Sequence, residues 1–169
     1  MASGKTSVAK ILGLHTESEI VNMDDVIEDS AGKTIPEIFA EKGGNDRFRI
    51  LEKNLVISLS INPQWRKQII STGGGAPCFH ENIDRMIHSG LVVYLRWTPE
   101  TLARRTILQD VKTGENLRPL LADMDLEARV RKIQELLEGR EPIYSKAHMT
   151  IDTDNHEPCD IAGMIINRE

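Results

Sequence analysis

Short strand-like runs alternate along the chain with longer segments whose apolar residues recur at helical spacing. The runs are SEIVNM (18–23), KQIIST (67–72), LVVYL (91–95) and MTID (149–152). LVVYL is wholly apolar, which is typical of a strand buried on both faces of a parallel sheet. The alternation predicts an α/β fold with three layers, a parallel sheet with helices on both faces. Such folds bind ligands at the carboxyl ends of their strands.

The helical segments carry start and stop signals as well as periodicity. TIPE (34–37) has the spacing of a capping box, and Thr98 followed by Pro99 is a typical N-cap with proline in the first turn. Gly13 is expected to end the first helix, because glycine commonly follows the last helical turn. Helices are therefore predicted over 5–13, 34–39, 46–59, 98–105 and 126–137, and from about residue 158 onward.

Composition narrows the class of protein. A chain of 169 residues is expected to form one domain with a real core. The formal charge of −5 argues against a protein that binds nucleic acid through bulk electrostatics. The two cysteines, Cys78 and Cys159, fit a reducing compartment, and no apolar run approaches the ~18 residues of a membrane span. We expect a cytoplasmic, monomeric protein without a nucleic-acid or membrane partner.

The chain opens with MASGKT (1–6), the last part of the pattern G-x-x-x-x-G-K-[ST]. In that loop backbone N–H groups surround nucleotide phosphates, the lysine bridges two of them, and the hydroxyl ligates Mg²⁺. The triplet alone is weak, because Gly-Lys-Thr also occurs by chance. It gains weight here because it opens a helix, and the N-terminal N–H groups of a helix form an anion site.

Two of the predicted strands end in residues that suit a ligand site. Asn22 and Asp24 alternate at the end of the first strand, so both can face one crevice, although helix capping also explains Asp24. STGGGAP (71–77) places Gly73, Gly74 and Gly75 after the second strand. Three glycines cost backbone entropy and supply no packing, so they indicate close approach of a ligand to the main chain.

Four basic residues allow both a functional and a plain structural interpretation. Arg49 either forms a surface pair with Glu52 three residues later or reaches inward to hold an anion. Arg140, near the end of a helix, either complements the helix dipole or binds a ligand. Lys112 and Arg118 lie in a polar stretch that is either an ordinary exposed loop or a mobile segment that supplies cations for phosphoryl transfer.

In chain order these stretches read G-K-T, an aspartate at a strand end, F-R-x-x-E, T-G-G-G, R-P-L-L and R-x-P-x-Y. This succession resembles the shikimate kinase family, small P-loop kinases with the fold of nucleoside monophosphate kinases. The resemblance extends from Met1 to about Asp152. It implies ATP-dependent phosphorylation of the 3-hydroxyl of shikimate, on the route to chorismate and the aromatic amino acids. It also implies a substrate-binding helical segment at about 25–62 and a lid at about 108–121.

The resemblance assigns residues to the nucleotide side of the site. Lys5 is expected to hold the β- and γ-phosphates, Thr6 to ligate Mg²⁺, and Arg118 on the lid to contact the transferred phosphoryl group. Lys112 lies near the family's nucleotide-side lid arginine, with a loop about one residue different in length. The full set implied to bind ATP is Ser3, Gly4, Lys5, Thr6, Ser7, Lys112 and Arg118.

On the acceptor side, the resemblance implies that Asp24 binds the shikimate hydroxyls and orients or activates the attacking one. Arg49 and Arg140 are expected to hold the substrate carboxylate, and the backbone of Gly73–Gly75 to line the same pocket. Lys5, Asp24 and Arg118 are then the catalytic residues. Two planar guanidinium groups and an aspartate suit a small carboxylate with several hydroxyls.

The sequence departs from the family pattern in three places. Asn22 stands where the family usually has an aspartate that supports Mg²⁺ through water, which weakens the expected metal interaction. GGNDRFR is one residue longer than the usual loop. The phosphate loop begins at Met1, and the apolar central strand that precedes it in the family is absent. We expect Met1 to be an internal methionine of a longer polypeptide, the alternative being a genuinely shortened protein.

Other functions remain open at this point. An enzyme resembling gluconate kinase or a nucleoside monophosphate kinase would keep the fold and change the acceptor, although F-R-x-x-E together with T-G-G-G favours shikimate. A binding module that keeps the shikimate pocket without productive use of ATP is the non-enzymatic alternative, because of Asn22 and the incomplete loop.

Overall fold

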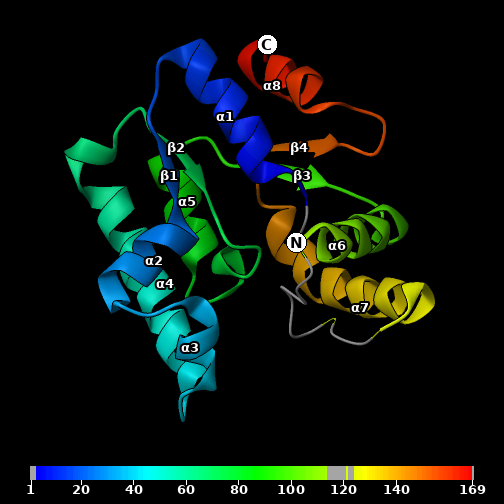
Figure 1. The fold of residues 1–169 in the computed structure, drawn as a ribbon. Coiled ribbons are helices and arrows are strands. Elements are labelled where there is room, and N and C mark those ends of the chain that lie inside the picture. The colour runs from blue at the N-terminus through cyan, green and yellow to red at the C-terminus, as the bar shows by residue number, and fades with distance from the viewer. Residues whose placement is uncertain (1–2, 114–120, 122–123, 169) are drawn as a thin grey trace.

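The computed structural model describes residues 3–113, 121 and 124–168. Figure 1 shows the arrangement of its elements. In chain order they are α1 (Lys5–Thr16), β1 (Ile20–Asn22), α2 (Met23–Ala31), α3 (Ile35–Ala40), α4 (Gly44–Ile61), η1 (Pro63–Trp65), β2 (Ile69–Ser71), η2 (Ala76–Cys78), α5 (Asn82–Ser89), β3 (Val93–Arg96), α6 (Pro99–Thr113), α7 (Leu126–Tyr144), β4 (Met149–Asp152) and α8 (Pro158–Ile166).

The strands form two parallel pairs. β1 pairs with β2, with Asn22 opposite Ser71, and β3 pairs with β4, with Arg96 opposite Asp152. Within the described residues no ladder joins the two pairs, and a cavity of about 1200 Å³ is lined by residues of both β2 and β3. The predicted α/β fold with parallel strands is therefore confirmed, and the strands occur as two separate pairs.

Helices surround these strands in three groups (Figure 1). α1 and α8 pack against each other and against β3 and β4, around a core that includes Val8, Ile151 and Ile161. α2, α3 and α4 form a second group, and α6 and α7 pack side by side as a third. In the part of the chain that the structure describes, no helix has the length and apolar character needed to cross a bilayer.

Most local predictions hold, with one clear exception. Thr34 and Glu37 form the expected capping box, and Thr98 Oγ1 accepts a hydrogen bond from the Thr101 N–H at 3.4 Å. Gly13, however, does not end the first helix, which continues to Thr16. A Cβ at Gly13 would lie 3.0 Å from the Ile20 side chain. The glycine therefore allows α1 to pack closely on the segment that follows it.

Candidate active site

The first turn of α1 is open at its N-terminal end. Gly4 precedes the helix with φ of 77°, in the left-handed region that glycine tolerates, and no side chain of the described residues caps the helix. The N–H groups at this end therefore remain available to an anion. Lys5 Nζ donates to Ser3 Oγ at 3.0 Å, while Thr6 and Ser7 are exposed. The predicted nucleotide residues 3–7 thus lie together at one helix terminus.

An aromatic residue that the sequence analysis did not assign supports this turn. Trp97 Nε1 donates a hydrogen bond to the Ser3 carbonyl at 3.0 Å, and the Arg105 guanidinium carbon lies 4.4 Å from the centre of the Trp97 ring. Both residues come from the β3–α6 region, 94 or more positions away in sequence from Ser3. No local sequence signal connects these positions, because the contact joins two segments that are far apart in the chain.

Asp24 lies in the first turn of α2, directly after β1. Asn22 is the N-cap: its Oδ1 accepts from the Asp24 N–H at 3.4 Å, and its Nδ2 donates to Asp25 Oδ1 at 2.7 Å. The alternative that Asp24 caps the helix is therefore wrong. Burial raises the pKa of the Asp24 carboxyl, and the nearby positive charge of Lys5 opposes this shift. Asp24 and Lys5 thus interact electrostatically across the site.

Arg49 and Glu52 form a buried ion pair on α4. Glu52 is 1% exposed, so the interpretation of the pair as a surface contact is wrong. Burial raises the pKa of the Glu52 carboxyl, opposed by the hydrogen bond from Arg49. The guanidinium carbon lies 4.2 Å from the centre of the Phe79 ring, and Arg49 Nε is buried without a hydrogen-bond partner among the described residues. The guanidinium therefore retains a donor for a ligand oxygen.

The glycine turn after β2 brings these side chains together. A Cβ at Gly73 would lie 3.2 Å from Glu52 Oε1 and 3.3 Å from Asp24 Oδ1. A Cβ at Gly75 would lie 2.7 Å from a terminal nitrogen of Arg49. The absent side chains thus allow the aspartate and the arginine to lie against the main chain, as the sequence predicted for a close approach.

Arg140 reaches the same region from α7. Its positive charge acts on Glu52, Cys78 and Tyr144, which places it beside the Arg49–Glu52 pair. The cavity is lined by Lys5, Gly73, Gly74 and Arg140. The structure therefore brings the predicted acceptor-side residues together from α2, α4, the glycine turn and α7.

Of the two predicted lid residues, the structure describes Lys112. Lys112 is exposed in the last turn of α6, so the expectation that it lies in a loop is wrong. Arg118 lies outside the described residues, as do Met1 and Ala2. The roles of Lys112 and Arg118 remain predictions.

Comparison with known proteins decides the family. The sequence model of shikimate kinase matches residues 1–168. The chain belongs to the shikimate kinase family. A shikimate kinase from Thermodesulfovibrio yellowstonii is 37% identical over 166 residues, which cover 98% of this chain and 88% of that protein.

Solved structures of shikimate kinases agree with this assignment. The crystal structure of shikimate kinase from Bacteroides thetaiotaomicron has a TM-score of 0.83 and 30% identity, with 98% of this chain and 91% of that chain covered. Shikimate kinase from Acinetobacter baumannii in complex with shikimate has a TM-score of 0.80 and 35% identity, with coverage of 98% and 86%. The predicted family and its P-loop kinase fold are confirmed.

Proposed function

We propose that this chain transfers the γ-phosphoryl group of ATP to the 3-hydroxyl of shikimate, giving shikimate 3-phosphate and ADP on the route to chorismate and the aromatic amino acids. One observation carries the proposal: Asp24, Arg49 and Arg140 converge on the glycine turn, and Arg49 Nε is buried with no hydrogen-bond partner among the described residues. This combination of charges suits a small carboxylate with several hydroxyls.

In this proposal the protein binds both the carboxylate and the ring hydroxyls of the acceptor. Arg49 and Arg140 bind the carboxylate through charge-assisted hydrogen bonds, which are shorter and stronger than neutral ones. Asp24 accepts hydrogen bonds from the ring hydroxyls, and the Gly73–Gly75 backbone lines the pocket. Residues 25–62 form the acceptor-binding segment.

Asp24 also has the character of a proton acceptor. Because burial raises its pKa, the carboxylate is more basic than an exposed aspartate. The 3-hydroxyl oxygen attacks the γ-phosphorus and its proton passes to Asp24, while the bond from the γ-phosphorus to the β,γ-bridging oxygen breaks and ADP leaves. The remaining demands of phosphoryl transfer are positioning and neutralisation of charge.

The first turn of α1 supplies that charge neutralisation. Its uncapped N–H groups and Lys5 face the β- and γ-phosphates, with Ser3, Gly4, Thr6 and Ser7 forming the rest of the phosphate cradle. The segment at about 108–121 would act as the lid, from which Lys112 and Arg118 would supply further cations to the nucleotide.

Mg²⁺ fits the residues that surround this turn. The exposed Thr6 hydroxyl and the Asn22 amide oxygen are hard oxygen donors of the type that Mg²⁺ prefers. Thr6 would hold the ion directly and Asn22 through water, and the bound ion would neutralise charge on the ATP phosphates.

The proposal also includes a monomeric state and a cytoplasmic location.

The test is release of ADP from ATP and Mg²⁺, followed in a coupled assay with and without shikimate. Release that requires shikimate is the expected result. Gluconate and a nucleoside monophosphate serve as matched alternative acceptors, and release with either of them in place of shikimate would reassign the substrate. Calorimetric binding of shikimate without ADP release would contradict the proposed transfer and favour a binding module.

A further inference from the structure

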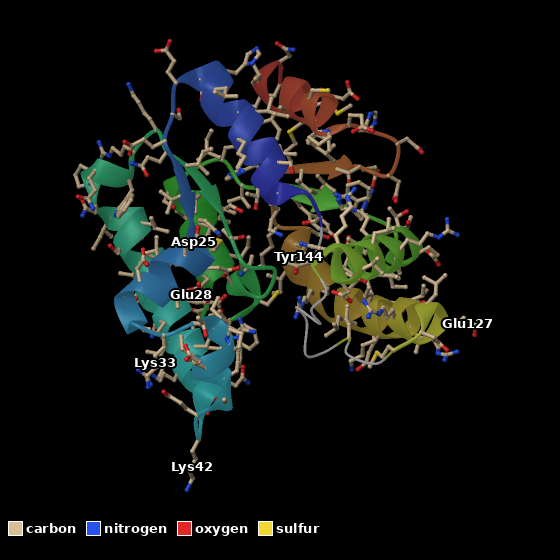
Figure 2. All side chains as sticks on the ribbon, in the orientation of Figure 1. Asp25, Glu28, Lys33, Lys42, Glu127 and Tyr144 are labelled. Atoms are coloured by element: carbon tan, nitrogen blue, oxygen red, sulfur yellow. The ribbon has the colours of Figure 1, made fainter. Side chains whose placement is uncertain are left out.

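Tyr144 connects the end of α7 to the glycine turn. Its hydroxyl donates a hydrogen bond to the Gly74 carbonyl, across 70 positions of sequence. Figure 2 shows Tyr144 near the middle of the molecule, at the inner end of α7, whereas Glu127 at the start of that helix projects outward. Both Tyr144 and Gly74 line the cavity that reaches Arg140 and Lys5.

The ring of Tyr144 is held in place by a second tyrosine. Tyr94 of β3 packs against it with ring centres 4.8 Å apart and planes tilted by 42°. The Tyr94 hydroxyl is directed elsewhere, since it donates to Glu141 Oε2 at 3.0 Å. Burial raises the pKa of the Tyr144 hydroxyl, so it remains protonated and able to donate at neutral pH. The two rings therefore pack in the same way, but the Tyr94 hydroxyl donates to Glu141 and the Tyr144 hydroxyl to Gly74.

The glycine turn needs such a contact. Three successive glycines carry no side chains that could fix the turn, and glycine loses more backbone freedom on folding than any other residue. Within the turn, the Ala76 N–H donates to the Gly73 carbonyl at 3.2 Å and the Cys78 N–H to the Gly75 carbonyl at 2.9 Å. The intervening Gly74 carbonyl is bound from outside, by Tyr144.

Arg140 and Tyr144 are four residues apart on α7, and residues at this spacing lie on the same face of a helix. We propose that Tyr144 is a positioning residue, which fixes the Gly73–Gly75 backbone relative to Arg140 and thereby shapes the pocket for shikimate. This inference rests on the proposed function. It assigns Tyr144 no contact with the reacting atoms.

Tyr144→Phe tests the inference, because it removes the hydroxyl and keeps the ring. We expect the Kd and KM for shikimate to rise about tenfold, the change that corresponds to about 1.4 kcal/mol. The KM for ATP should stay within twofold. Tyr94→Phe is the matched control: it alters the other ring of the same pair and should leave shikimate binding within twofold of the parent.

The parent protein is measured first by calorimetry with shikimate. No binding by the parent would refute the proposed function, and the inference with it. If the parent binds and both variants bind equally well, Tyr144 is merely structural and the inference is overturned. An equal loss of binding in both variants would also overturn it, since the packing of the rings would then be the cause. Circular dichroism and Tm establish that each variant is folded, as expected for a substitution that conserves ring volume.

Discussion

At the scale of single residues, the surroundings of Asp24 disfavour the ionised form of its carboxyl group. Burial raises its pKa, and Lys5 offsets this only in part. At neutral pH the folded state therefore bears a cost for the ionised carboxyl that the unfolded chain avoids. We expect Asp24→Asn to raise the free energy of unfolding at pH 7 by less than about 1 kcal/mol, because the carboxyl is partly exposed and water screens the cost; urea denaturation measures the change.

The sign of the pH dependence follows from the raised pKa. Below the unfolded-state pKa the carboxyl is protonated in both states and the cost is absent; it develops as the pH rises through the folded-state pKa. The stability advantage of Asp24→Asn should therefore shrink toward zero as the pH is lowered from 7 to about 3. Its kcat should fall by about 10²–10⁴-fold through loss of the proton acceptor. An unchanged kcat would exclude Asp24 from catalysis.

At Gly75 we expect a substitution to weaken shikimate binding while leaving the stability of the fold nearly unchanged. A Cβ there would lie 2.7 Å from a terminal nitrogen of Arg49, the far end of a flexible side chain, so the guanidinium can move while the backbone stays in place. The backbone of Gly75, with φ of −86°, also suits alanine. We expect Gly75→Ala to raise the KM for shikimate about tenfold, equivalent to about 1.4 kcal/mol, with a change in Tm below about 2 °C.

Gly163→Ala is the matched control for this substitution. Gly163 lies within α8, and a Cβ there would meet no atom of the described residues within 4 Å. Alanine in a helix interior is favoured over glycine by roughly 0.5–1 kcal/mol, so this variant should be more stable and bind shikimate normally. A KM increase in both variants would rule out displacement of Arg49 as the cause.

At the scale of elements, the cap of α2 is also part of the predicted metal site. Asn22 caps through Oδ1 and donates through Nδ2 to Asp25. Asn22→Asp keeps a good cap, because asparagine and aspartate cap equally well, and it adds a carboxylate toward the expected position of Mg²⁺. We expect a lower Mg²⁺ concentration for half-maximal ADP release, or a higher kcat. A Mg²⁺ titration that changes neither value would contradict this role.

Elements whose local signals agree with their packing could be predicted from sequence. β4 occupies residues 149–152 as predicted, and the capping box at Thr34 forms. The prediction for Gly13 is wrong because a glycine that ends a helix and a glycine that allows close packing give the same local signal. The Arg49–Glu52 spacing likewise fits both a surface pair and a buried pair, and burial is decided by how α4 packs against the glycine turn.

At the scale of the whole molecule, the candidate site joins parts that lie far apart in the chain. The first turn of α1, helices α2 and α4 and the end of α7 all contribute residues to the cavity that Gly73 and Gly74 also line. The sequence predicted this meeting for the residues at strand ends, because the carboxyl ends of parallel strands share an edge. It did not predict the hydrogen bonds from Trp97 to Ser3 and from Tyr144 to Gly74, which join segments far apart in the chain.

A ligand that binds across these parts should stabilise the whole fold. Shikimate at about 100 times its Kd is expected to raise the free energy of unfolding by about 2.7 kcal/mol, because it binds the folded state alone. For a chain of this size that corresponds to a Tm increase of roughly 5–10 °C in a thermal denaturation scan. Gluconate at the same concentration offers a carboxylate on a flexible chain of hydroxyls, so it matches the two arginines without the geometry of a ring and should shift Tm by less than about 2 °C. An equal shift with both compounds would mean that the site selects the carboxylate alone, and a shift with gluconate only would remove shikimate as the acceptor.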